Sequence, residues 1–275
     1  MDLTDVRDLI VPEIYERGLL LTAGYPVTET GKALEEMSEL FQALGICQFL
    51  LTMDVMGFRI NLTRSGQARR YFLRKSAELR NIHDHRLALS RSEGFLDSVV
   101  AGDWSLARDI VRLSNWDWNG NWEYEDDYCY FMILHNLVTQ PGDSLSANII
   151  SLAERFERVL EGAPSPRLDV CRALMLRNED GFAEGLIGLL DEEKLRNDQK
   201  RPAVTESQFL FWPRSFISIE GLALLKIAGA AEMTVPSDFF LCPEEARLPD
   251  MDGSPSDIFA ELDTAIAADG GNPRG

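Results

Sequence analysis

The most constraining feature of the sequence is an almost unbroken apolar run from Tyr128 to Val138. It reads Y-C-Y-F-M-I-L-H-N-L-V, which leaves no continuous polar face on a helix. A helix that is apolar all round is covered by neighbouring elements on every side. The run therefore predicts a central helix over residues 123–138, and the rest of the chain must supply the elements that bury it.

A second apolar segment, residues 216–230, predicts another core helix. It is too short and too charged to span a bilayer. Glu220 lies within it among leucine and isoleucine, so its carboxylate needs a partner or a raised pKa. We interpret Glu220 as a structural buried acid paired with an arginine, for which the basic segment 59–91 is one source. A catalytic-acid role would need a second group, and the sequence offers none.

The remaining chain carries apolar residues spaced three and four apart, the pattern of amphipathic helices. The predicted helices cover residues 1–21, where Pro12 would kink the helix or begin a new turn. Further helices are predicted over residues 30–57 capped by Thr30, 94–101, 103–113, 149–160, 168–177 and 180–190. Residues 191–208 are highly polar, so a helix end followed by an exposed loop is expected there. The predicted fold is all-α, a single domain of stacked antiparallel helical hairpins over residues 1–248. Residues 249–275 are expected to form a flexible tail with a short helix at 257–268.

Aromatic and acidic residues are concentrated just before the central helix. Three of the five tryptophans of the chain lie between positions 116 and 122. Carboxylates follow in the first turn, where the positive end of the helix dipole favours them. This is either an ordinary charged helix start beside a tryptophan-rich loop or a recognition surface, since Trp and Tyr contribute much of the energy of protein interfaces. The candidate binding residues are Trp116, Trp118, Trp122, Glu123, Glu125, Asp126, Asp127 and Tyr128.

The charge balance limits the classes of partner. With 45 acidic and 27 basic residues, the net charge is −18. Direct nucleic-acid binding needs a basic surface, so it is not expected, and a basic protein partner is favoured. The sequence shows no secretory signal pattern and no long apolar run, which predicts a cytoplasmic protein without membrane contact. The four cysteines are widely separated and predict reduced core residues.

Residues 59–91 form a basic segment in this acidic chain, with nine basic and two acidic residues. One interpretation is an internal complement to carboxylates on adjacent helices. The alternative is a phosphate-binding surface. The His83, Asp84 and His85 run within it resembles the dipeptide of HD-type phosphohydrolases only over two residues. On a helix the two imidazoles would point about 200° apart and could not share one ion. We therefore predict no metal site, no cofactor and no catalytic residues.

No G-x-S-x-G elbow, Walker loop, dinucleotide fingerprint, H-E-x-x-H or C-x-x-C motif occurs, so a binding protein is favoured over an enzyme. Several segments between roughly residues 95 and 245 resemble the immunity protein 49 family. They are A-G-D-W at 101–104, E-Y-E-D-D-Y-C-Y at 123–130, R-L-D-V-C-R-A-L at 167–174, D-G-F at 180–182 and S-I-E-G-L-A-L-L-K-I-A at 218–228.

The resemblance implies a mostly helical protein that binds and silences a toxin encoded beside it. Such toxins are secreted or contact-delivered in interbacterial competition, for example by type VI secretion. The expected partner is a cognate toxin domain, which we expect to be a basic nuclease. A basic surface fits an acidic inhibitor, because opposite charges steer the two proteins together. The alternative function is a helical-repeat adaptor or scaffold that binds a basic host protein. An enzyme that uses Glu220 or the His83 and Asp84 pair is the third hypothesis.

Overall fold

The structure is a computed structural model that describes residues 2–23, 25–79, 83–140, 146–251 and 255–268. The described residues form helices and connecting loops, with no strand among them, which confirms the predicted all-α fold. The α-helices are α1 (Leu3–Thr22), α2 (Val27–Thr52), α3 (Val55–Glu78), α4 (Glu93–Ala101), α5 (Trp104–Leu113), α6 (Glu125–Thr139), α7 (Ala147–Val159), α8 (Pro166–Leu176), α9 (Glu179–Lys200), α10 (Phe211–Arg214), α11 (Ile219–Ala230) and α12 (Ile258–Ala268). Short 3-10 turns are η1 (His85–Leu87), η2 (Arg201–Ala203), η3 (Glu206–Gln208) and η4 (Glu244–Ala246).

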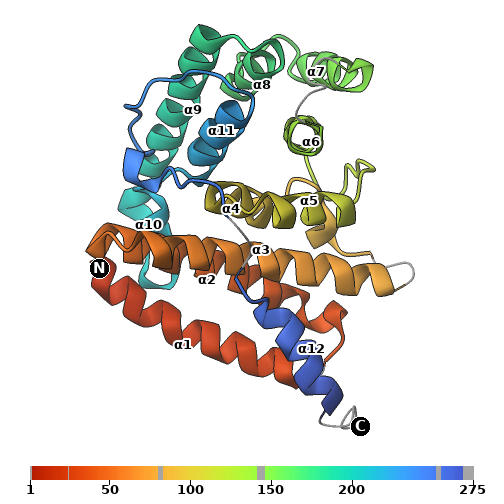
Figure 1. Ribbon diagram of the computed structural model, residues 1–275, viewed down its shortest axis with the longest axis vertical. Helices are drawn as coiled ribbons and strands as arrows, with labels where there is room; N and C mark the ends of the chain where they lie inside the picture. Colours follow the sequence, from red (N-terminus) through yellow and green to blue (C-terminus); the bar gives the residue numbers. More distant parts are fainter. Residues whose placement is uncertain (1, 24, 80–82, 141–145, 252–254, 269–275) are drawn as a thin grey trace.

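The helices are arranged in tiers along the long axis of the molecule (Figure 1). At the bottom, α1 packs against α2, and α2 packs against α3. The middle tier contains α4 and α5, which both contact α3, while α6 to α9 and α11 form the upper part. One hydrophobic core runs through the tiers, and a smaller cluster lies between α1 and α2.

The predicted central helix is α6. Every residue from Tyr128 to Val138 is buried, because α5, α7 and α8 surround it. The second predicted core helix is α11, which begins at Ile219 rather than at residue 216. Ser218 ends the preceding loop and caps the helix by accepting a hydrogen bond from the Gly221 amide at 3.0 Å. Phe216, outside the helix, is 44% exposed.

Gly102 and Asp103 form the turn between α4 and α5. Gly102 adopts a left-handed conformation with φ of 78°, and a Cβ there would lie 2.7 Å from the Pro249 carbonyl oxygen. Asp103 then caps α5 by accepting a hydrogen bond from the Leu106 amide at 3.0 Å. Glycine and aspartate at these two positions therefore set the turn between α4 and α5.

Three helix boundaries differ from the prediction. α1 continues through Pro12 as one helix. α2 begins at Val27, so Thr30 lies in its first turn, and it ends at Thr52 because Met53 is left-handed and Asp54 caps α3. α9 extends to Lys200, well beyond the apolar pattern 180–190, so the expected helix end lies within the polar segment 191–208. Its Glu, Lys, Arg and Gln residues are good helix formers, and Lys194 pairs with Asp198 one turn later.

The C-terminal segment contributes to the fold through α12, which packs against α3 and α1. Phe259 of α12 is 2% exposed and its ring centroid lies 5.4 Å from that of Tyr71. All four cysteines are buried and free, as predicted. None of the helices in the described residues is long and apolar enough to cross a membrane.

Candidate functional site

The loop between α5 and α6 presents the predicted aromatic residues and is fixed by hydrogen bonds. The Trp116 indole N–H donates to the Val111 carbonyl at 3.1 Å, and the Tyr128 hydroxyl donates to the Trp116 carbonyl at 2.7 Å. A turn follows in which the Trp122 amide donates to the Asn119 carbonyl at 2.9 Å. These bonds tie the loop to the helices on both sides, so it is a defined surface.

Aromatic side chains on this loop reach solvent to different degrees. Trp116 is 39% exposed, Trp118 is 41% exposed and Tyr124 is 79% exposed. Trp122 is half-buried. Tyr128 is only 4% exposed, so its ring supports the loop from below and offers little surface to a partner.

Three of the four predicted binding carboxylates already have partners within the protein. Glu123 accepts a hydrogen bond from the Ser90 amide at 2.8 Å. Glu125 pairs with Arg155 of α7, and Asp127 pairs with Arg167 of α8, each at 2.7 Å. Burial raises the pKa of Asp127, and Arg167 opposes that rise.

Asp126 is different from its neighbours. It lies in the first turn of α6, and no described residue forms an ion pair or side-chain hydrogen bond with it. Among the four predicted binding carboxylates, it is therefore the one that can meet a cationic group of a partner without first losing an internal contact.

Arg155 connects the carboxylates to the tryptophan loop. Its guanidinium lies 5.4 Å from the Trp118 ring centroid and 5.1 Å from that of Tyr128, while its Nε donates to Glu125. The Arg155 side chain therefore takes part in both the cation–π contacts and the ion pair. Arg155 therefore holds Trp118 in place over the start of α6.

Behind the loop lies a cleft of about 660 Å³. It is lined by the loop segment 120–124, by residues 90–96 and by side chains of α6, α8 and α11. Arg167 lies in this lining and donates two hydrogen bonds to Glu220, at 2.8 and 2.9 Å, and a third to Asp127 at 2.7 Å. Its guanidinium also lies 4.6 Å from the Tyr130 ring centroid. Glu220 thus has the arginine partner expected from the sequence, but the arginine comes from α8 and not from residues 59–91.

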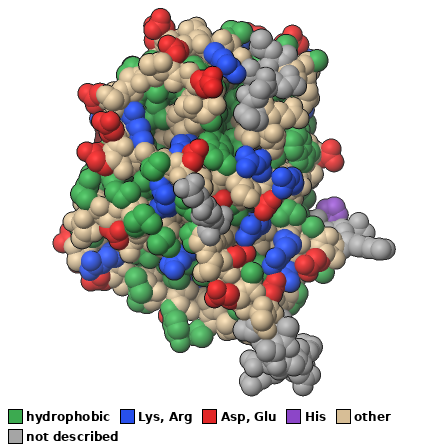
Figure 2. Space-filling view, in the orientation of Figure 1, with side chains coloured by type: hydrophobic (Ala, Val, Ile, Leu, Met, Phe, Trp, Pro, Cys, Tyr) green, Lys and Arg blue, Asp and Glu red, His purple; other side chains and the backbone are tan. Residues whose placement is uncertain are grey.

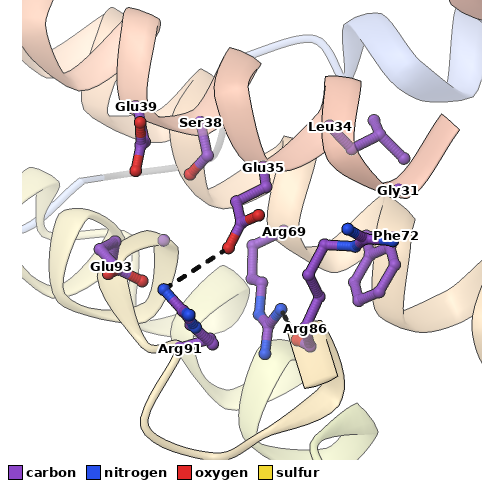
Figure 3. Close-up of a pocket in the computed structure, with 11 residues that line it drawn as sticks. Gly31, Leu34, Glu35, Ser38, Glu39, Arg69, Phe72, Arg86, Arg91 and Glu93 are labelled. Carbon is purple, nitrogen blue, oxygen red and sulfur yellow. Dashed lines mark hydrogen bonds and ion pairs between the residues drawn. The ribbon is translucent and has the colours of Figure 1, made fainter. Parts of the chain in front are cut away.

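A second, smaller pocket adjoins the cleft and shares Arg91 and Glu93 with it. Figure 3 shows Glu35 and Glu39 projecting from one helix toward Arg91 and Glu93 on the opposite wall. Arg91 and Glu35 form an ion pair at 3.8 Å. Burial raises the pKa of Glu39, against the attraction of a nearby arginine. Acidic and basic groups alternate here, so the pocket favours neither a strong anion nor a strong cation.

Part of the basic segment 59–91 pairs with carboxylates of other elements, in line with the first interpretation of it. Arg70 pairs with Asp109 and Asp257, and Arg74 and Lys75 pair with Asp263. Figure 2 shows acidic side chains scattered among Lys and Arg over one face of the molecule, without a continuous basic area.

The His83, Asp84 and His85 run does not assemble a metal site. Asp84 is buried and pairs with Arg86 at 2.9 Å, while both histidines are exposed. Within the described ranges, no three His, Cys, Asp or Glu residues lie close enough together to hold a metal ion. Asp84 is therefore a structural residue that orders η1. Its carboxylate accepts a hydrogen bond from the Arg86 amide at 2.9 Å.

Sequence reasoning missed the two arginines that organise the site. Arg155 and Arg167 lie 30 and 40 residues beyond the carboxylates that they hold, and no local pattern connects them. Tyr124 was also omitted from the predicted binding residues, although an aromatic residue directly before a charged helix start is a signal for exposure. It is the most exposed large aromatic side chain of the loop.

Three comparisons with known proteins complete the description. A family model described as Immunity protein 49 matches residues 48–246, which is more than half of the chain. The match spans α3 to α11 and therefore includes the tryptophan loop, the cleft and both organising arginines. Searches of the curated proteins and of the solved structures found no match.

Proposed function

Because the chain belongs to the immunity protein 49 family, we propose that it binds a cognate bacterial toxin and neutralises it through the face formed by the tryptophan loop. The toxin is a basic nuclease, and the protein covers its active site or the path of its substrate. The toxin is delivered by secretion or by cell contact, and the complex forms in the cytoplasm of the cell that the immunity protein protects.

The observation that carries this proposal is a rigid aromatic loop above a polar cleft. Trp116, Trp118 and Tyr124 expose large rings on a backbone that internal hydrogen bonds fix. Aromatic residues are enriched at the energetic centres of interfaces, and a preorganised surface loses less conformational entropy on binding. A ready-made aromatic surface suits an inhibitor that must bind tightly.

The carboxylates contribute in two ways. Glu125 and Asp127 hold Arg155 and Arg167, so their role is to keep the loop and the cleft in shape. Asp126 is free to pair with a toxin Lys or Arg. The net charge of −18 adds long-range attraction, which accelerates association with a basic partner and weakens as salt screens it.

Calorimetric titration tests the proposal, with the toxin domain encoded by the adjacent gene as titrant at low and high salt. We expect nanomolar or tighter binding that weakens with salt. Trp118→Ala should weaken binding by about 2 kcal/mol or more, roughly 30-fold, because it removes an anchor. Asp126→Ala should have a smaller effect that disappears at high salt.

The matched control for Trp118→Ala is Tyr15→Ala, which removes a ring that is 67% exposed on α1, in a different tier of the molecule. It should leave the affinity unchanged. Equal affinities for the wild type, Trp118→Ala and Asp126→Ala, with all variants folded, would place the binding face elsewhere. Complete absence of binding would favour an adaptor for a basic host protein, and a pull-down from the native cell would then identify its partner.

A further inference from the structure

A separate hollow of about 210 Å³ lies at the opposite end of α6 from the tryptophan loop. Its apolar lining consists of buried side chains from α6, α8 and α11, namely Leu137, Val138, Leu174 and Ile227. Trp104 and Arg108 of α5 and Arg177 at the end of α8 complete it. Since α6 has 15 residues, its two ends are about 20 Å apart. A ligand here would not touch the proposed toxin-binding face.

Arg108 and Arg177 are unusual among the arginines of this protein. Most described arginines form ion pairs with Asp or Glu, as Arg17, Arg70 and Arg167 do. Others donate to main-chain oxygens or stack on aromatic rings. Within the described part of the chain, the arginine side chains that make none of these contacts are Arg108, Arg177 and Arg196.

Two of these three arginines line one apolar hollow, in a chain with 45 carboxylate side chains. Arg108 is half-buried, so it has lost part of its hydration without gaining a protein partner. Guanidinium groups bind carboxylates and phosphates through paired N–H donors. The arrangement therefore points to a ligand in which an anionic group is attached to an apolar chain or ring.

The surrounding helix ends restrict the charge of that anion. Last-turn residues of α6, α8 and α11 line the hollow, and each helix C-terminus carries roughly half a negative charge on its free carbonyls. The combined positive charge of the two arginines slightly exceeds the summed partial negative charge of the three helix ends. A single negative charge is therefore accommodated, whereas a doubly charged phosphate monoester would be repelled by the carbonyls.

One wall of the hollow is rigid. The Trp104 indole N–H donates to Asp250 at 2.9 Å, and Asp250 also pairs with Lys226 at 2.8 Å. The ring is thus held in place before any ligand arrives. A volume of about 210 Å³ is smaller than the roughly 300–1,000 Å³ of sites for drug-sized ligands, so the apolar body must be small.

We infer that this hollow binds a small monocarboxylate with a short apolar chain or ring, with the chain against Leu174 and Ile227 and the carboxylate between Arg108 and Arg177. The inference does not rest on the proposed toxin-binding function, because it uses neither the tryptophan loop nor the cleft behind it.

The test is titration of the full-length protein with octanoate, followed by ¹⁹F spectroscopy of 5-fluorotryptophan-labelled protein. The Trp104 resonance is assigned from the Trp104→Phe variant. We expect saturable 1:1 binding with a Kd of about 0.1–1 mM, and a shift of the Trp104 resonance but not of the loop tryptophans. 1-Octanol, which lacks the charge, should bind at least tenfold more weakly.

Arg108→Gln and Arg177→Gln should each weaken octanoate binding about tenfold. The matched control is Arg196→Gln, which removes the third unpaired arginine, at an exposed position of α9, and should leave the Kd unchanged. Thermal unfolding confirms that each variant is folded. The inference is overturned if octanoate fails to saturate by about 10 mM, if 1-octanol or octyl phosphate binds as tightly, or if all three arginine variants bind alike.

Discussion

At the scale of single residues, the buried acid Asp97 leads to a prediction about how stability depends on pH. Its side chain is 0% exposed and lies in α4. It accepts hydrogen bonds from Gln42 of α2, at 2.8 Å, and from Ser65 of α3. These bonds favour the charged carboxylate, but burial outweighs them and raises the pKa of Asp97 to about 7.

This shift predicts that Asp97 contributes a stability penalty that grows as pH rises. The folded protein keeps a proton on Asp97 that the unfolded chain releases near its ordinary pKa, so the stability penalty grows between about pH 4 and pH 7. Asp97→Asn removes the titration and keeps a hydrogen-bonding group at the same place. We expect its free energy of unfolding to exceed that of the wild type by about 2–4 kcal/mol at pH 8 and to differ little at pH 4.

Urea unfolding at several pH values measures this difference directly. Other half-buried acids with raised pKa values, such as Glu39 and Asp127, are present in both proteins, so the comparison isolates Asp97. Parallel pH profiles for wild type and variant would show that Asp97 does not hold a proton in the folded protein.

At the scale of helices, the sequence predicts long apolar patterns better than polar ones. α6 follows from the apolar run 128–138, and the cap at Asp103 follows from its residue type and position. The end of α9 does not follow from the sequence, because residues 191–200 are polar in both a surface helix and a loop. The site shows the same limit. The aromatic loop was predictable from local clustering, whereas Arg155 and Arg167 reach it only through the packing of α7 and α8 on α6.

α12 provides a prediction about a helix whose role the sequence left open. Its Phe259 is buried against α3, so Phe259→Ala should lower the free energy of unfolding by about 3 kcal/mol through lost burial and a residual cavity. Denaturant unfolding measures the loss. The control is Thr264→Ala, at an exposed position of the same helix, which should change stability by less than about 0.5 kcal/mol. Equal stabilities of the two variants would mean that α12 is not docked in solution.

At the scale of the whole molecule, part of the basic segment 59–91 pairs with carboxylates from distant parts of the chain. Arg70 and Arg74 reach carboxylates of the C-terminal segment, while the outer surface stays acidic overall. The composition gives the net charge of the chain. The acidic partners of the basic side chains are visible only in the folded arrangement.

The whole-molecule charge predicts that the protein does not bind nucleic acid. In fluorescence anisotropy with labelled duplex DNA and single-stranded RNA, we expect no binding at about 0.15 M salt and at most weak binding at low salt. A steep salt-dependent affinity in the micromolar range would instead show that Arg and Lys side chains of residues 59–91 are accessible to phosphate.

The pairing of Arg70 with Asp257 also has a consequence for the order in which the chain is made. The two residues are 187 positions apart. At bacterial and eukaryotic synthesis rates, the aspartate leaves the ribosome roughly 10–40 s after the arginine. During that interval Arg74 lacks Asp263, while Arg70 and Lys75 have only Asp109 and Glu78 as acidic partners. Asp257 and Asp263 can pair with Arg70, Arg74 and Lys75 only after the segment that carries α12 has been synthesised.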